Sequence, residues 1–214
     1  MPVAKLPWPP PAVELATLEP DIYVLPAGSL LWRVYARGGP FPTAWRDVRH
    51  FGPLISARFD HHLPDSDGRP CHQARGILYA ADSIVTCLAE FFQETRTINR
   101  SRREPWLVGM ETVADLVLLN LRDVWPTRAG ASMALNSGDR ARVRRWSRII
   151  YEAYPSVEGL WYCSSMNANN PSLALYDRGR HAIPAVPTFH RALADPTMFL
   201  WLAEAADRLR YGLV

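Results

Sequence analysis

The sequence has few cysteines and no long apolar run. Only Cys71, Cys87 and Cys163 occur among its 214 residues, and none has a Cys-x-x-Cys spacing. Three cysteines cannot all pair within one chain, which argues against a disulfide framework and favours a reducing, cytoplasmic location. No stretch approaches the roughly 18 to 20 apolar residues of a membrane span, and the N-terminus lacks the apolar segment of a signal peptide. We therefore expect neither a membrane protein nor one secreted through a standard signal.

The sequence also lacks a large charge excess. Its formal net charge is +3, which is too small to predict a phosphate-polymer partner unless the charges cluster. Hydrophobic residues make up 48% and charged residues 21%, so composition excludes a disordered, collagen-like or coiled-coil chain. No internal repeat is evident. The length favours one domain preceded by an arm.

Proline is concentrated at the N-terminus, in residues 1–28. Because proline fixes φ and lacks a backbone N–H, we expect neither a regular helix nor a central strand there. The apolar Trp8, Leu15 and Ile22 predict that this arm lies along the body of the protein, with a contact to another chain as the alternative. We assign 1–28 as the arm, 29–194 as the main domain and 195–214 as a C-terminal helix on that domain.

Residue patterns place the secondary structure. Asp82 or Ser83 is suited to cap a largely apolar helix, and Asp195-Pro196 to begin the last helix. Strands and helices do not alternate as in a doubly wound sheet, so we predict an α+β fold. The expected strands are 30–36, 54–59, 76–81, 106–110, 116–121, 159–164 and 173–176, and the expected helices are 84–93, 139–154 and 195–211.

Four polar side chains stand in apolar surroundings. Arg33 lies within a predicted strand, Arg58 at a strand end, Tyr79 within the next strand, and Glu90 within an apolar helix. Buried ionisable groups are costly unless they have a partner or a ligand. Taken singly, each is more often structural than functional. An Arg33–Glu90 pair inside the core is therefore an alternative to a binding site.

Four segments together resemble the RES domain, a family named for its Arg, Glu and Ser. The resemblance extends from about Leu31 to Tyr176, and its most distinctive parts are the Tyr79–Glu90 interval and the Gly-x-x-Tyr-x-Ser run. The segments are Leu31-Trp32-Arg33-Val34, Arg58-Phe59, Ile77 to Ser83 followed by Cys87-Leu88-Ala89-Glu90, and Gly159 to Ser164.

The resemblance implies a single domain related to ADP-ribosyltransferases, with mixed or antiparallel sheets flanked by helices. For family members that act as toxins, it implies consumption of NAD and an antitoxin partner that covers the active-site entrance. NAD is then a consumed substrate and no resident cofactor is expected, although inorganic phosphate is a candidate co-substrate. The oligomeric state stays open, a homo-oligomer included.

The chemistry of NAD suggests a role for each residue. Arg33 and Arg58 suit the pyrophosphate, because a guanidinium grips phosphate oxygens in pairs. Tyr79 suits stacking on the nicotinamide or a ribose. Glu90 suits a ribose hydroxyl and the cationic transition state of glycosidic cleavage. Ser164 suits the nicotinamide amide or Glu90, and we prefer it to Ser165 because of the Tyr-x-Ser spacing. Glu90, Arg33 and Ser164 form the predicted catalytic set.

The acceptor of the ADP-ribosyl group stays open. Water gives hydrolysis, phosphate gives phosphorolysis, and a protein side chain gives ADP-ribosylation. We place breakdown of NAD ahead of protein modification, because no separate substrate-recognition domain is visible.

The sequence also contains residues typical of a nucleic-acid or acidic-partner binding surface and of a metal site. A nucleic-acid or acidic-partner binding module is suggested by Arg100, Arg102, Arg103 and the arginines of 139–154, although such runs usually form a solvated face, and we expect no direct nucleic-acid binding. The metal-capable side chains of one loop match no standard zinc spacing, so we predict no metal site. Those side chains are His61, His62, Cys71 and His72.

Overall fold

One large mixed sheet organises the computed structural model, which describes residues 4–214. Nine strands of the described chain form it: β1 (Ile22–Leu25), β2 (Leu30–Ala36), β3 (Arg49–Gly52), β4 (Cys71–Ala81), β6 (Pro105–Glu111), β7 (Leu116–Asn120), β8 (Gly159–Cys163), β9 (Pro171–Tyr176) and β10 (Phe189–Ala192). The order is β1-β7-β8-β9-β4-β2-β6-β10, with β3 beside β4. Only the β7–β8 ladder is parallel within this sheet of the described residues. A small parallel sheet joins β5 (Thr97–Ile98) and β11 (Gly212–Leu213).

Two of the three longer helices of residues 4–214 begin at a capping side chain, whereas the C-terminal helix has no side-chain cap of its own. Ser83 accepts a hydrogen bond from the Thr86 N–H at the start of α2 (Ile84–Phe91), and Asp139 accepts one from the Arg142 N–H at the start of α5 (Arg140–Ala153). The remaining helices are α1 (Ala12–Leu15), α3 (Trp125–Arg128), α4 (Ala134–Ser137), α6 (Phe199–Leu209) and the 3-10 turns η1 (Asp177–Ala182) and η2 (Pro196–Met198).

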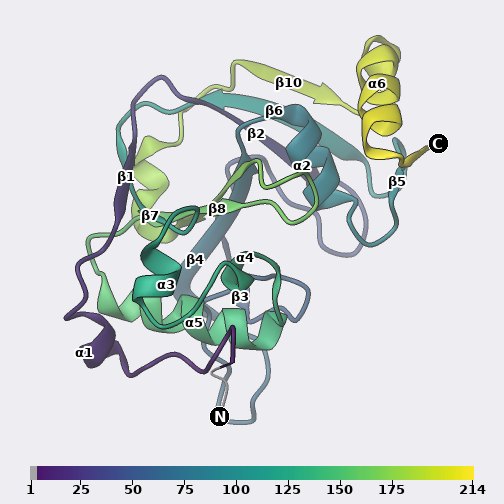
Figure 1. Ribbon diagram of the computed structural model, residues 1–214. Coiled ribbons are helices and arrows are strands. Elements are labelled where there is room, and N and C mark those ends of the chain that lie inside the picture. The colour runs from purple at the N-terminus through teal and green to yellow at the C-terminus, as the bar shows by residue number, and fades with distance from the viewer. Residues whose placement is uncertain (1–3) are drawn as a thin grey trace.

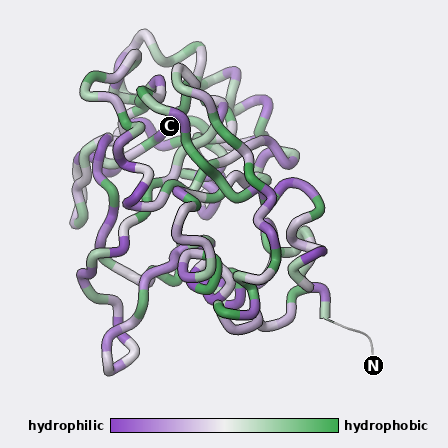
Figure 2. The backbone as a smooth tube through the Cα atoms, turned by 90° about the vertical axis from the view of Figure 1, so that its left-hand side faces the viewer, coloured by the Kyte–Doolittle hydropathy of each residue, from purple (hydrophilic) through white to green (hydrophobic). Residues whose placement is uncertain are grey.

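The helices gather at two places around the sheet. Figure 1 shows α1, α3, α4 and α5 together at one end and α6 at the other, beside β5. Val143, Trp146 and Ile150 of α5 are buried against Leu160 of β8, whereas α2 and α6 share a separate core with β2 and β6. Figure 2 shows hydrophobic and hydrophilic residues interspersed along the whole trace. These layers confirm the predicted α+β class.

The N-terminal arm lies along the body of the protein. Leu6 and Leu15 are buried in the core, and the Trp146 Nε1–H donates to the Pro7 carbonyl over 2.9 Å. Arg142 Nη1 donates to the Leu6 carbonyl over 2.8 Å. Strand β1 then adds to the edge of the sheet by pairing with β7. The sequence did not predict this edge strand.

The predicted strand at 54–59 is wrong. This segment forms turns, because side chains rather than a neighbouring strand satisfy its backbone. The Leu54 N–H donates to Asp60, the Ile55 carbonyl accepts from Arg144, and the Phe59 carbonyl accepts from Ser147. The strand beside β4 is instead β3, which ends before this segment.

The arginines of α5 mostly bind other parts of the chain. Arg142 binds the arm, Arg144 the Ile55 carbonyl, and Arg140 the Gln93 side chain. Arg100 donates to the carbonyls of 193–195. These side chains are committed to internal contacts, which weakens the case for a solvent-facing phosphate-binding stripe. No helix of residues 4–214 is both long and apolar enough to cross a membrane.

Candidate functional site

The sheet opens between β2 and β4. These strands pair only at Trp32 and Ala81, whereas β2 pairs with β6 along its whole length. Helix α2 follows β4 after two residues and packs against both strands. Arg33 on β2, Tyr79 on β4 and Glu90 on α2 thereby come from the elements that meet at this opening.

Glu90 and Ser164 are in direct contact. Ser164 follows β8 and is fully buried, and its Oγ–H donates to Glu90 Oε1 over 2.5 Å. The N–H groups of Met166 and Asn167 each donate to the same Ser164 oxygen over 3.2 Å. Because those two donors occupy the acceptor side of the hydroxyl, its hydrogen is directed to Glu90. The loop therefore fixes Glu90 Oε1 as an acceptor.

The loop that carries Ser164 is tied to the start of α2. The Asn167 Nδ2–H donates to Thr86 Oγ1 over 2.9 Å, and Thr86 Oγ1 in turn lies 2.7 Å from the Ser83 hydroxyl. The Ser164 N–H closes the loop by donating to the Asn170 carbonyl. Ser165, the competing serine, is exposed and does not contact Glu90. The geometry thus places Ser164 rather than Ser165 beside the carboxylate.

Burial raises the pKa of Glu90 above its ordinary value of 4.5. The Ser164 hydrogen bond and the charges of Arg58 and Arg140 oppose that rise. Oε2 of Glu90 accepts no hydrogen bond from any residue in 4–214. The carboxylate is therefore held through one oxygen while the other stays available.

Arg58 lies in the turn segment at 54–59, close enough to Glu90 for each to shift the pKa of the other. Its Nη1–H donates to the Gly138 carbonyl over 2.7 Å, which leaves its remaining N–H groups without a partner among residues 4–214. Burial and the Arg140 charge lower the pKa of Arg58, and Glu90 opposes them. A half-buried cation thus faces the carboxylate without pairing to it directly.

Two tyrosines line this neighbourhood. The Tyr79 hydroxyl is buried and has no hydrogen-bond partner within residues 4–214, and burial raises its pKa. Tyr162 of β8 packs against Phe59 in a tilted arrangement, with ring centroids 4.6 Å apart. Burial and the nearby Glu90 charge raise the pKa of Tyr162 as well. Both phenols are therefore neutral aromatic groups: Tyr162 is near Glu90 and Arg58, and Tyr79 is near Arg58 and Asp60.

Arg33 is set apart from the other four predicted residues. Its Nη1–H donates to the Asp47 carbonyl over 3.2 Å, and burial lowers its pKa to about 10, so it stays charged at neutral pH. Arg33 and Glu90 both act on Cys87: burial raises the pKa of its thiol to about 12, Arg33 opposes the rise and Glu90 adds to it. Within residues 4–214 no ion pair or hydrogen bond joins Arg33 to Glu90, so the alternative of a paired core is wrong.

Sequence reasoning missed Asp60, which organises the Arg58 segment. Its buried carboxylate accepts hydrogen bonds from Arg49 Nη2 (2.9 Å), the Leu54 N–H (2.6 Å) and both the backbone and ring nitrogens of His62. Burial alone would raise the pKa of Asp60, but these donors hold it at about 2. The signal was present in the sequence, since an acid directly follows the motif pair Arg58-Phe59.

The paired histidines of this segment are buried. His62 is a partner of Asp60, and His61 stacks on Tyr151 with ring centroids 4.3 Å apart. Burial and the neighbouring His62 and Arg75 charges lower the pKa of His61 well below its ordinary value. These contacts give both histidines a place in the packing around Asp60.

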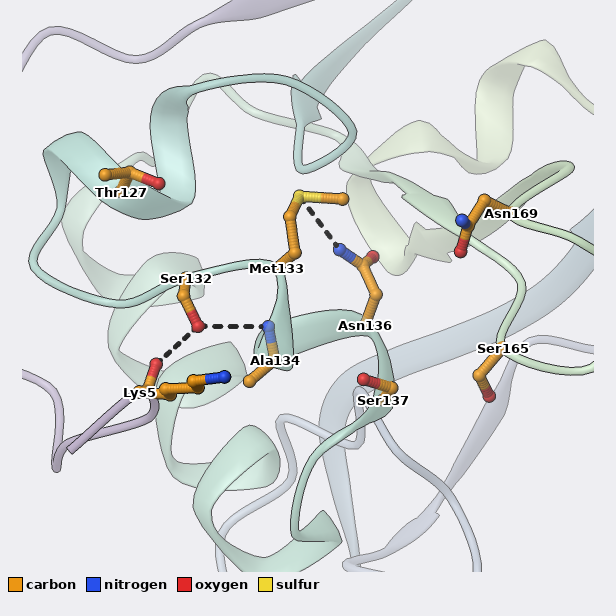
Figure 3. A pocket seen from close by; sticks show the side chains of 9 residues that line it. All are labelled: Lys5, Thr127, Ser132, Met133, Ala134, Asn136, Ser137, Ser165 and Asn169. Carbon is orange, nitrogen blue, oxygen red and sulfur yellow. Dashed lines mark hydrogen bonds between the residues drawn. The ribbon is translucent and has the colours of Figure 1, made fainter.

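A cavity of about 610 Å³ adjoins the Glu90 neighbourhood. None of the five predicted residues lines it, but Ser165 follows Ser164, and Ser137 precedes Gly138, the residue that binds Arg58. Figure 3 shows Lys5 on one side and Ser165 and Asn169 on the other, with Asn136 and Ser137 between them. The remaining lining residues are Thr127, Ser132, Met133 and Ala134.

The family of this chain follows from its match to a protein-family model. The model of the RES domain matches residues 30–200. The chain belongs to the RES domain family. The match includes all five predicted site residues, Arg33, Arg58, Tyr79, Glu90 and Ser164, and leaves the N-terminal arm outside.

The fold of this RES domain protein is also found in a solved structure. A chain of the M. tuberculosis MbcT–MbcA toxin–antitoxin complex superposes with a TM-score of 0.55 at 14% sequence identity. The alignment covers 91% of this chain and 97% of that one. No curated protein sequence matches the chain. The structural likeness therefore supports the mixed α+β architecture.

Proposed function

We propose that this RES domain protein consumes NAD by cleaving the bond between nicotinamide and ribose. The observation that carries the proposal is the contact between Ser164 and Glu90. It anchors one oxygen of a half-buried carboxylate and leaves the other free, beside an incompletely paired guanidinium. A fixed anion near a fixed cation suits a substrate that has a cationic glycosidic centre and an anionic pyrophosphate.

Glu90 acts at the sugar. Its free Oε2 accepts a hydrogen bond from a ribose hydroxyl, and its charge stabilises the oxocarbenium character that develops as nicotinamide leaves. Ser164 keeps the carboxylate oriented, so no reorganisation is needed during the reaction. Electrons of the cleaved C–N bond leave with nicotinamide, and the acceptor then attacks the ribose carbon.

Arg58 and Arg33 act at the pyrophosphate. Arg58 acts on the pKa of Glu90 and has donors to spare, whereas Arg33 comes from β2 and donates to the Asp47 carbonyl. Tyr79 and Tyr162 supply neutral aromatic surface for the nicotinamide and its ribose. Together these groups orient the substrate and keep water from the reacting bond.

The acceptor is identified by product masses. Purified protein is incubated with NAD in phosphate-free buffer and in phosphate buffer. Free ADP-ribose in both indicates hydrolysis, a phosphorylated ADP-ribose only with phosphate indicates phosphorolysis, and a mass increase on protein indicates ADP-ribosylation. We expect a small-molecule product, and exclusive labelling of protein would contradict that expectation.

We further propose that the protein is the toxin of a toxin–antitoxin pair, with an antitoxin that covers the Glu90 opening. Membership in the RES family and the fold shared with a chain of a toxin–antitoxin complex support this role. Induced expression without a partner should lower cellular NAD and stop growth, and expression of Glu90→Gln should do neither. If both forms were equally toxic, the growth arrest would not be caused by NAD cleavage, and the proposed toxin mechanism would be wrong.

Ser164→Ala should lower kcat for NAD cleavage by about tenfold to a hundredfold, because Glu90 loses the donor that orients it. Ser165→Ala is the comparison variant for this step: at saturating NAD its kcat should stay within about twofold of that of the unchanged protein, because Ser165 forms no hydrogen bond with Glu90 within residues 4–214. Initial rates of nicotinamide release measure both variants. A larger loss of kcat in Ser165→Ala than in Ser164→Ala would assign the orienting role to Ser165 instead.

Arg58→Ala should raise KM for NAD by more than tenfold, because a charge-assisted phosphate contact is lost. Arg58→Lys keeps the charge but not the planar fork, so it should recover only part of the affinity. Steady-state kinetics over a range of NAD concentrations test this. An unchanged KM in the alanine variant would remove Arg58 from substrate binding.

A further inference from the structure

The cavity of about 610 Å³ has a chemistry that suits one half of a dinucleotide. Among the described residues 4–214, Lys5 is the only charged side chain that lines it, and no acidic residue does. The hydroxyls of Thr127, Ser137 and Ser165 have no hydrogen-bond partner within residues 4–214. The volume lies in the usual range for small-molecule sites, roughly 300 to 1,000 Å³. A cation with spare hydroxyls in a space of this size favours an anionic, hydroxyl-bearing ligand.

The position of the cavity relative to Glu90 fits the same ligand. Arg58 has contacts toward both: its charge lowers the pKa of Glu90, and its Nη1–H donates to the carbonyl of Gly138, next to the lining residue Ser137. Ser164 holds Glu90, and the next residue along the chain, Ser165, lines the cavity (Figure 3). A molecule with its scissile ribose at Glu90 and its pyrophosphate at Arg58 would extend its other end into this space.

The cation of the cavity comes from outside the family match. The RES model begins at residue 30, and Lys5, the only lysine of the sequence, belongs to the arm. Two hydrogen bonds hold this part of the arm: Ser132 Oγ–H donates to the Lys5 carbonyl over 2.5 Å, and Arg142 donates to the carbonyl of the buried Leu6. These contacts bring the Lys5 backbone to the cavity edge.

We propose that this cavity binds the adenosine monophosphate half of NAD and that Lys5 of the arm is its phosphate-facing cation. The proposal rests on the function proposed above. The free hydroxyls of Ser137 and Ser165 bind the ribose, and the thioether of Met133 contacts the adenine face, as soft sulfur side chains do with aromatic rings. The arm then contributes to substrate affinity although it carries no reacting group.

Lys5→Gln and Lys5→Arg test the assignment, with exposed Arg102→Gln as the control for loss of a surface charge. We expect Lys5→Gln to raise KM for NAD by about fivefold to tenfold with kcat within twofold, and Lys5→Arg to restore most of the affinity. AMP should inhibit NAD cleavage competitively, and its inhibition constant should weaken by the same factor in Lys5→Gln. Arg102→Gln should change neither constant.

The outcomes separate this proposal from the proposed reaction. Direct titration of the protein with AMP, followed calorimetrically, does not depend on catalysis. Lys5-dependent AMP binding without NAD cleavage would support the nucleotide site and overturn the reaction. NAD cleavage without competitive inhibition by AMP, or with equal constants in the Lys5 and Arg102 variants, would overturn the assignment of the cavity.

Discussion

Glu90→Gln is expected to lower the rate of NAD cleavage by about a hundredfold to a thousandfold, the range found when one preorganised electrostatic partner of a transition state is removed. Glutamine keeps the shape of the side chain and an oxygen that accepts the Ser164 hydrogen bond. It loses the charge that opposes the developing oxocarbenium ion. Because the change acts mainly on the transition state, kcat should fall far more than KM rises.

The Glu90→Gln substitution that lowers activity should not lower stability. Burial raises the pKa of Glu90 in the folded protein, so its ionised form lowers the free energy of unfolding as the pH rises through that pKa. Glu90→Gln should therefore have an equal or higher Tm at pH 7.5, and this difference should vanish below about pH 4. Thermal unfolding across that pH range provides the measurement. A lower Tm at pH 7.5 would show that the charge is structural.

Glu90 also predicts the acid limit of activity. Catalysis needs the carboxylate, and its pKa lies above the ordinary 4.5, so activity should fall with decreasing pH earlier than an exposed glutamate would allow. Ser164→Ala removes a contact that lowers this pKa and should move the acid limb to higher pH. A pH profile of kcat for both forms tests the shift, and coincident limbs would argue against Glu90 as the titrating group.

Asp60→Asn is expected to lower the free energy of unfolding by about 3 kcal/mol at pH 7, because removing one member of a buried charge pair leaves the other uncompensated. Oδ2 of Asp60 accepts from both Arg49 and the Leu54 N–H, and Oδ1 accepts from His62. An asparagine has only one acceptor oxygen for these donors. Denaturant unfolding measures the loss, and Asp67→Asn, an exposed acid of the following loop, is the control.

The effect of Asp60 should depend on pH in a defined direction. Its pKa is about 2 in the folded protein against 3.8 ordinarily, so its stabilisation is present above about pH 4 and is lost as the pH falls toward 2. The difference between the unchanged protein and Asp60→Asn should shrink by about 2 kcal/mol between pH 5 and pH 2. If the difference in the free energy of unfolding stayed constant over that interval, the ionised Asp60 carboxylate would not be the source of the stabilisation.

The elements that the sequence predicted well are those with local signals. The strand at 30–36 has the predicted bounds, and Ser83 and Asp139 begin their helices as capping residues should. The segment at 54–59 was mispredicted because its backbone is satisfied by side chains from distant parts of the chain. No local pattern encodes such partners.

The candidate site also has some features that the sequence predicted and others that it did not. The motif resemblance singled out Glu90 and Ser164, which lie 74 residues apart and are hydrogen-bonded in the structure. It did not reveal that Arg33 binds the Asp47 carbonyl, nor that Asp60 holds the Arg58 segment. The Lys5 cavity was also hidden, because it forms only where the arm meets residues 132–137 and 165–169. Non-local packing decides these features.

The most direct test of the account is a time course of nicotinamide release from NAD by the purified protein, free of any bound partner. The account predicts nicotinamide in large molar excess over protein, with a matching ADP-ribosyl product, and at least a hundredfold slower release by Glu90→Gln. A folded, partner-free protein that leaves NAD intact, or a Glu90→Gln variant that releases nicotinamide at the unchanged rate, would contradict it.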